Sequence, residues 1–334
     1  QSDAQGNFMF ANIPAGSDIQ IRSSRSGTYT AGLTTADIIR IQRQLLGLEP
    51  FSHSWEYLAA DVDMSGGIST RDIVYLRRLL LGKIQELPHQ HSYLFIDPSY
   101  TFSDPASPYA DLDLCSKVVI TQARQNETVR MLAIKIGDVN QSYRANGLTE
   151  VPYETIRFFA ERSERRMGVF ISQPVSIRGF QMSLSASGLC KDWITGLISA
   201  LPEWSNEHYR LEGSEIVISY SSPGILHWDP SVPLFEIQLK EDAAFCAGEL
   251  QLSNVLDPEC YLVDAARTIS LLQKDAQSAS PPFSWVRTHS DPGTGMHVVH
   301  LYTASASDVD VQIYDLNQRT ISAATRPLQQ GLNE

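Results

Sequence analysis

The chain has 334 residues, a length that fits two to four ordinary domains, and 43% of them are hydrophobic, which is enough for real cores. It carries 38 acidic and 26 basic side chains, and this excess of negative charge argues against nucleic acid and anionic membrane surfaces as partners. No apolar run approaches the length of a membrane span.

The first 23 residues predict a strand followed by a turn. Apolar and polar side chains alternate from Gly6 to Ile13, and Pro14-Ala15-Gly16 has the composition of a turn. The stretch resembles the closing strands of the prealbumin-like β-sandwiches of bacterial surface proteins. The resemblance implies that residues 1–23 are the tail of a preceding sandwich.

Residues 24–90 contain two copies of one loop-and-helix unit, and the copies align at an offset of 35 residues, with Leu33 matching Ile68. In each copy a Ser/Thr pair precedes apolar residues at helical spacing, and a glycine closes the unit. We therefore expect two helices. Their apolar stripes are too wide for so small a unit to bury unaided, so we expect them to pack on other parts of the same chain.

The second loop, from Asp61 to Asp72, has the spacing of a calcium-binding loop. Oxygen-bearing side chains occupy positions 1, 3, 5, 9 and 12, and Gly66 stands at the sixth position, where such loops bend sharply. The alternative is a solvated acidic turn before a helix. The loop predicts a calcium site with ligands from six residues: Asp61, Asp63, Ser65, Gly67, Ser69 and Asp72.

The first loop, from Ser26 to Asp37, offers only hydroxyl side chains before its aspartate. It lacks the carboxylates that outweigh the cost of stripping calcium of its water, so we expect one well-formed site in the pair. Two tandem loop-helix units of this length resemble a type I dockerin. The resemblance implies calcium as the cofactor and a helical surface that meets a cohesin-like domain.

Residues 91–148 read as an irregular segment, in which Asp138-Val139-Asn140 repeats the opening of a calcium loop without a helix behind it. An Asx turn is the local alternative. The Gly-Asp-Val-Asn signature at 137–140, placed after a dockerin-like pair, resembles a block found in large secreted surface proteins of the Bacteroidota, where a cohesin-like β-sandwich follows. We expect the segment to pack on the helices. Asp138 and Asn140 are then candidates for a second metal site beside the depleted first loop.

Residues 149–273 show short alternating strands separated by Gly, Pro, Asn and Asp, a cadence typical of an antiparallel β-sandwich. The run Ile177–Met182 resembles a strand of cohesin-like domains, with Gly179 allowing the backbone to bend as it enters the sheet. The alternative is the start of an ordinary strand, because alternation alone does not separate cohesins from other sandwiches.

Residues 274–334 begin with a small polar linker, followed by Pro281-Pro282-Phe283 and two expected strands, at 296–302 and 309–316. This region resembles the C-terminal sorting domain read by the type IX secretion system. Two positions depart from that family, which usually has Asn-Pro-Phe at the start and a glycine before the arginine. We expect an incomplete β domain.

The sequence thus predicts a multi-domain, mainly β protein that combines antiparallel β-sandwiches with a small α-helical, dockerin-like calcium-binding pair. It contains no Gly-x-Ser-x-Gly, His-Glu-x-x-His or phosphate-binding glycine motif. We expect a non-catalytic, calcium-stabilised structural or adhesive module, extracellular or on the cell surface, that assembles with itself or with other surface proteins. The alternatives are an accessory C-terminal tail of a secreted hydrolase and a dockerin that binds cohesins on other chains.

Overall fold

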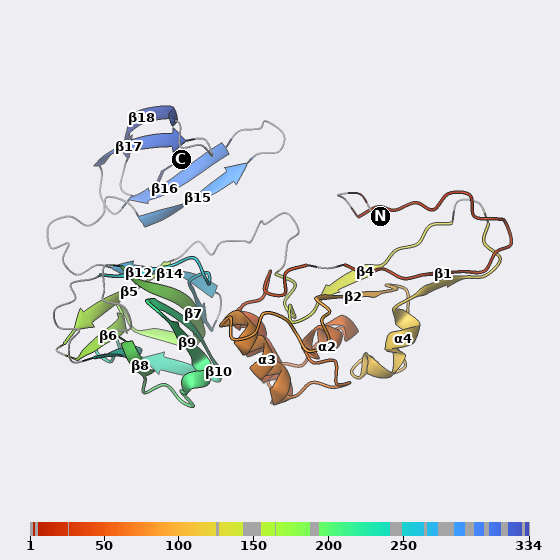
Figure 1. The fold of residues 1–334 in the computed structure, drawn as a ribbon. Helices are drawn as coiled ribbons and strands as arrows, with labels where there is room; N and C mark the ends of the chain where they lie inside the picture. The colour runs from red at the N-terminus through yellow and green to blue at the C-terminus, as the bar shows by residue number, and fades with distance from the viewer. Residues whose placement is uncertain are drawn as a thin grey trace. The chain divides into compact units, whose positions relative to one another are not determined.

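The computed structural model is mainly β, with several antiparallel sheets, as the sequence predicted. It divides into two compact units, Gln1–Leu271 and Leu272–Glu334, which we describe separately (Figure 1). No helix in the described part of the chain is long and apolar enough to cross a membrane. The described residues are 3, 6–25, 27–124, 127–142, 155–163, 165–187, 194–240, 249–263, 266–272, 284–290, 297–303, 307–314, 320–328 and 331–333.

The two helices expected from the repeat are α1 (Thr35–Leu45) and α3 (Thr70–Leu80). Each begins with a capping box, in which a hydroxyl residue caps the helix and an aspartate three residues later bonds back to it. Each ends before a glycine with a φ of +67°. Shorter helices complete the set: α2 (Ser54–Ala60), α4 (Leu112–Cys115), and the 3-10 turns η1 (Pro108–Asp111) and η2 (Asn206–His208).

The apolar faces of α1 and α3 lie in one hydrophobic cluster with the segment that follows them. Ile41, Leu76 and Ile136 are each 0% exposed there. The segment also supplies three strands of two small antiparallel pairs, and the fourth strand, β1 (Ile19–Ile21), precedes the helices. The pairs are β2 (Tyr93–Ile96) with β4 (Leu132–Lys135), and β3 (Val118–Ile120) with β1.

The strand expected within residues 6–13 is absent from the described residues of that stretch, where the backbone is irregular. Met9 and Phe10 are 87% and 61% exposed. Alternation does not make a strand unless a neighbouring strand takes up its backbone hydrogen bonds. The pairing near this end of the chain is made by β1 instead.

Residues 155–272 form one antiparallel sheet, in the order β8-β11-β6-β5-β14-β13-β7-β10-β9, with β12 also paired to β7. Its strands are β5 (Thr155–Arg162), β6 (Arg166–Ile171), β7 (Val175–Ser187), β8 (Ile194–Ile198), β9 (Tyr209–Glu212), β10 (Glu215–Trp228), β11 (Phe235–Leu239), β12 (Glu249–Leu252), β13 (Glu259–Leu262) and β14 (Ala266–Leu272).

This sheet folds over on itself around a single core. Phe180 of β7 and Phe235 of β11 are five strand steps apart in the sheet order, yet their ring centroids are 6.2 Å apart. In a flat sheet, five steps of about 4.8 Å would separate them by roughly 24 Å. Phe158 of β5 and Tyr220 of β10 contact the same ring. Two layers of strands therefore face each other across these aromatic side chains.

Helix α1 packs against β7 and β10 of this sheet, and α3 contacts β10 and η2. Val217 and Leu256 from the sheet side lie in the same hydrophobic cluster as the helices. The polar contacts are specific: the Thr35 amide donates to Gln181 Oε1 at 2.7 Å, and Arg77 Nη2 donates to Ser221 Oγ at 2.8 Å. Residues 1–271 thus form one compact unit.

The second unit contains two small antiparallel sheets. One joins β15 (Ser284–Ser290), β16 (His297–Thr303) and β19 (Gly331–Asn333), and the other joins β17 (Ser307–Tyr314) and β18 (Thr320–Leu328). The strands expected at 296–302 and 309–316 correspond to β16 and β17. The expected linker and the Pro-Pro-Phe start lie outside the described residues.

Gly179 lies opposite Ser221, where the backbone of β7 passes close to that of β10. A Cβ atom added there would lie 2.4 Å from the Tyr220 carbonyl oxygen and 3.2 Å from Ile39 Cδ1 of α1. We predict that Gly179→Ala lowers the free energy of unfolding by about 1–3 kcal/mol, the usual cost of overpacking. Denaturant titration of the full chain measures this change.

The control is Gly224→Ala, because a Cβ added there has Ser222 Oγ at 3.9 Å as its nearest neighbour. That substitution should change stability by no more than about 0.5 kcal/mol. Equal effects of the two variants would show that the backbone approach at Gly179 is not what excludes a side chain.

Candidate metal centre

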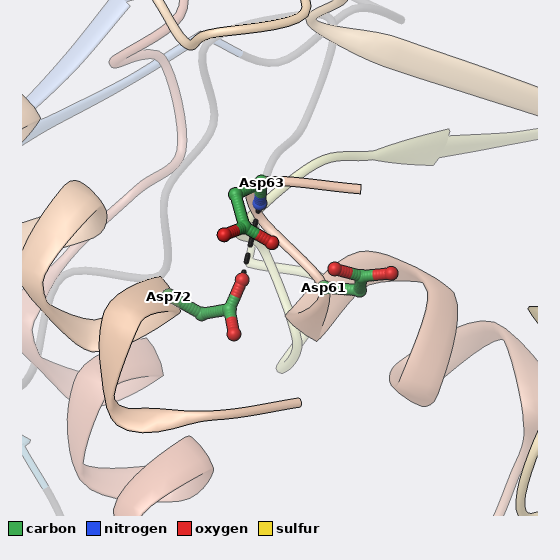
Figure 2. A group of neighbouring side chains, drawn as sticks. All are labelled: Asp61, Asp63 and Asp72. Atoms are coloured by element: carbon green, nitrogen blue, oxygen red, sulfur yellow. Dashed lines mark hydrogen bonds between the residues drawn. The ribbon is translucent and has the colours of Figure 1, made fainter. Parts of the chain in front are cut away.

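The three carboxylates expected from the sequence come together in the loop between α2 and α3 (Figure 2). Asp61 ends α2, Asp63 lies in the loop, and Asp72 is the third residue of α3. One oxygen from each lies within 4.8 Å of the others. Asp61 and Asp72 are 4% and 0% exposed, so this is not a solvated acidic turn.

Backbone amides hold the loop in a wrapped conformation. Asp61 accepts hydrogen bonds from the amides of Ser65 at 2.9 Å and Gly66 at 2.8 Å, and the Asp63 amide donates to Asp72 Oδ1 at 3.1 Å. Gly66 has a φ of +89°, the left-handed conformation that the sharp bend requires. The backbone amides of the loop itself therefore hold it around the carboxylates.

The other three predicted ligands also lie at this loop. Ser65 Oγ donates to the Gly67 carbonyl oxygen at 3.3 Å, and the Ser69 amide donates to Asp72 Oδ2 at 2.8 Å. His89, which the sequence did not indicate, donates from Nε2 to the Val62 carbonyl at 2.8 Å and fixes the loop from outside.

The electrostatics of the loop favour a cation. Burial raises the pKa of Asp61, and the charges of Asp72 and Asp63 add to the rise. Burial likewise raises the pKa of Asp72, with Asp63 contributing. Burial also acts on Asp63, but bonds from Ser65 and the charge of Arg71 bring its pKa below the ordinary value. Arg71 is 69% exposed, so the guanidinium offsets little of the negative charge in the loop.

Asp138 and Asn140 lie beside the depleted first loop. The amides of Val139 and Asn140 donate to Asp37 Oδ1 at 3.0 and 3.4 Å, and both Asp138 and Asn140 accept from the Ser142 amide, at 2.9 and 2.8 Å. Asp37 and Asp138 are buried, at 0% and 4% exposed. Burial raises the pKa of Asp37 well above its ordinary value, and the charge of Asp138 raises it further.

These two segments together reproduce the arrangement of the Asp61–Asp72 loop, which we term the continuous loop. The second arrangement, which we term the composite loop, takes positions 1, 3 and 5 from one segment and positions 7, 9 and 12 from the other. In order, its residues are Asp138, Asn140, Ser142, Gly32, Thr34 and Asp37.

The hydrogen bonds of the two loops match position by position. The position-5 amide donates to the position-1 carboxylate at 2.9 Å in both loops. The position-3 amide donates to the position-12 carboxylate at 3.1 Å in the continuous loop and 3.4 Å in the composite loop. The position-5 hydroxyl donates to the position-7 carbonyl at 3.3 and 2.9 Å, and the position-9 amide donates to position 12 at 2.8 and 2.9 Å.

The described residues just before Gly32 do not take part in this arrangement. Their backbone is held by Lys135, whose Nζ donates to the carbonyl oxygens of Thr28 at 2.8 Å and Tyr29 at 3.0 Å. Burial lowers the pKa of Lys135 to about 8. The sequence did not indicate Ser142 or Gly32 as site residues. The signals were present, however: Asp-x-Asn-x-Ser matches Asp61-x-Asp63-x-Ser65, and Gly32 matches Gly67 in the repeat.

The chain matches no protein-family model, and comparison with curated proteins finds none that is similar to it. The geometry of the two loops is therefore the basis for the function proposed below.

The buried carboxylate of Asp37 predicts a pH dependence of stability when divalent cations are removed. Because its folded-state pKa is raised, Asp37 favours folding below its unfolded pKa of roughly 3.9, and this contribution is lost as the pH rises through the folded-state value. Asp37→Asn stays neutral. In chelator, the free energy of unfolding of the variant should therefore increase relative to that of the wild type as the pH rises.

Denaturant titrations at a series of pH values measure the difference. Asp229→Asn is the control, because hydrogen bonds from Ser231 lower the pKa of Asp229. For Asp229, the free energy of unfolding of the wild type should increase relative to that of the variant as the pH rises, which is the opposite sign. A difference for Asp37→Asn that does not change with pH would contradict the raised pKa.

Proposed function

We propose that the chain is a non-catalytic structural module of an exported protein, that it binds calcium at both loops, and that bound calcium stabilises its fold. The observation that carries the proposal is the position-by-position match between the composite loop and the continuous loop. A single cluster of aspartates is common without a metal. Two copies of the same oxygen arrangement, reached from different segments, favour a common ligand.

The continuous loop has the chemistry of a calcium site. Calcium is a hard cation that takes six to eight oxygen ligands, and this loop offers carboxylates, hydroxyl groups and a carbonyl at the positions where calcium loops place them. Three carboxylates within 4.8 Å of one another repel unless a cation lies between them. Such a site suits the calcium-rich fluid that surrounds exported proteins.

The composite loop should bind calcium more weakly. It brings two carboxylates and one neutral asparagine where the continuous loop has three carboxylates, and affinity depends on the charge of the ligand set. The ammonium group of Lys135 is also close enough to Asp138 for their charges to interact. We therefore propose two sites of unequal affinity.

Calcium binding at these loops would be structural. The continuous loop joins α2 to α3, and the composite loop joins the 138–142 segment to α1. Binding to the folded chain alone stabilises it by mass action. The resemblances of residues 24–148 and 149–273 support a role in adhesion or surface assembly, and that of residues 274–334 supports export through a type IX system.

The packing of the helices supports a structural role over that of a free dockerin. Ile38, Ile41 and Leu76 are each 0% exposed, and the sandwich of the same chain covers the helices with Val217 and Leu256. A cohesin on another chain would have to displace these contacts.

We predict that the full chain binds two calcium ions, one more tightly than the other. Asp61→Asn should remove the tighter site and most of the calcium-dependent rise in melting temperature, and Asp138→Asn should remove the weaker site. Isothermal titration calorimetry of chelator-treated protein and native mass spectrometry measure affinity and stoichiometry.

The matched control is Asp229→Asn. Asp229 also accepts hydrogen bonds from a serine two residues later, at 2.8 Å from the amide, but it is exposed. This variant should still bind two calcium ions. A wild-type melting temperature that is the same in chelator and in millimolar calcium would refute the proposal, and a variant Asp138→Asn that still binds two ions would refute the composite site.

A further inference from the structure

We infer that calcium at the composite loop controls the docking of the helix pair on the sandwich of its own chain, whereas calcium at the continuous loop does not. The inference rests on the proposed function and adds a division of labour between the two sites. It follows from the positions of the two helix starts, because the start of α1 contacts the sandwich and Thr70 at the start of α3 is exposed.

The first turn of α1 belongs to the composite loop and to the sandwich interface at the same time. Asp37 provides position 12 of the loop and accepts the Thr34 amide at 2.9 Å. Thr35, the first residue of α1, is 0% exposed. Its amide donates to Gln181 Oε1 and its hydroxyl meets Ser219 Oγ, both at 2.7 Å. The cation ligand Asp37 and the docking residue Thr35 thus lie within one turn of the same helix.

A third residue of the sandwich, after Gln181 and Ser219, lies at the same place. Tyr261 of β13 is 5% exposed, and its hydroxyl donates to Glu259. Burial and Glu259 raise the pKa of Tyr261. A hydrogen bond with the Thr34 side chain lowers this pKa, and the charge of Asp37 raises it. Tyr261 of the sandwich therefore lies beside Thr34 at position 9 and close enough to Asp37 at position 12 for that charge to act on it.

The first turn of α3 has no such role. Thr70, which corresponds to Thr35 in the repeat, is exposed, and Arg71 beside it bonds to Asp63 of its own loop. The contacts of α3 with the sandwich come from its other end, through Arg77 to Ser221 and Arg78 to Glu207. Loss of a cation at the continuous loop would therefore act at a distance from the interface.

A calcium ion in the composite loop would join Asp138 and Asn140 of the 138–142 segment to Asp37 of α1. Losing the ion, through a chelator or through loss of a ligand, would therefore loosen that segment from α1. The Thr35 amide would then lose the orientation that places it on Gln181. Calcium and docking favour the same arrangement of this turn, so each should strengthen the other by the same factor.

The first test compares wild type, Asp138→Asn and Asp61→Asn as full chains at a calcium concentration that fills both wild-type sites. Hydrogen exchange of the Thr35 amide and hydroxyl-radical labelling of Leu256 report docking from the helix side and from the sandwich side. The exchange rate of the Thr35 amide and the labelling rate of Leu256 should each rise by about five-fold or more in Asp138→Asn. Five-fold is the lower end of typical coupling between two sites. In Asp61→Asn both should stay at the wild-type level.

The second test runs the coupling in reverse and leaves the cation ligands intact. Gln181→Leu removes the acceptor of the Thr35 amide, so calcium affinity at the composite loop should fall by about five-fold or more while the tighter site is unchanged. Gln251→Leu, at an exposed position of β12, is the matched control and should leave both affinities unchanged.

The outcomes separate the two proposals. If Asp138→Asn loses one calcium ion but Thr35 and Leu256 stay protected, the coupling is wrong and the proposed function stands. If the wild type binds no calcium, the proposed function fails with it. Should Asp138→Asn not fold, Gln181→Leu decides: an unchanged affinity at the weaker site overturns the inference.

Discussion

Two buried carboxylates at the starts of α1 and α3 are the constraint on which the helical part of the molecule depends. Asp37 and Asp72 are 0% exposed, and each occupies the third position of its helix. A carboxylate removed from water is costly unless its charge is compensated. Backbone amides at the helix start compensate part of it, because the helix dipole favours negative charge there. A second aspartate beside each one adds the repulsion that a cation would relieve, so loop, helix start and cation form one unit.

The two loops reach the same arrangement by different routes, one from consecutive residues and one from segments that lie 102 residues apart at the Val139–Asp37 bond. Gly137 makes the second route sterically feasible. It has a φ of +90°, and a Cβ added there would lie 3.1 Å from the side chains of Leu33 and Leu76. Closing a loop of this length costs more conformational entropy than closing a short one. A cation in the composite loop would thus hold together parts of the chain that local structure cannot.

The features that could be predicted from the sequence are those set by neighbouring residues. The capping residues and apolar spacing predicted α1 and α3, and the spacing from Asp61 to Asp72 predicted three carboxylates that the structure brings together. The helix α2 was not predicted, because seven residues are too few to show a helical period. Asp138 and Asn140 indicated the distant segment that completes the first loop, but Ser142 was missed because its hydroxyl is assigned to position 5 only when the folded chain brings it to the Gly32 carbonyl.

The interface between helices and sandwich is polar enough for its stability to depend on a cation. Arg77 is 9% exposed, donates to Ser221 at 2.8 Å, and has no hydrogen-bond partner for Nε among the described residues. Burial lowers its pKa, which means that the charged form loses solvation there. Glu207 and Glu203 act on Arg77 through their charges, but among the described residues neither forms an ion pair with it. The desolvation of Arg77 therefore offsets part of the stabilisation that Val217 and Leu256 provide. This cost lowers the net free energy of docking, and the lower that free energy is, the more a coupling of ordinary size to calcium binding would shift the docking equilibrium.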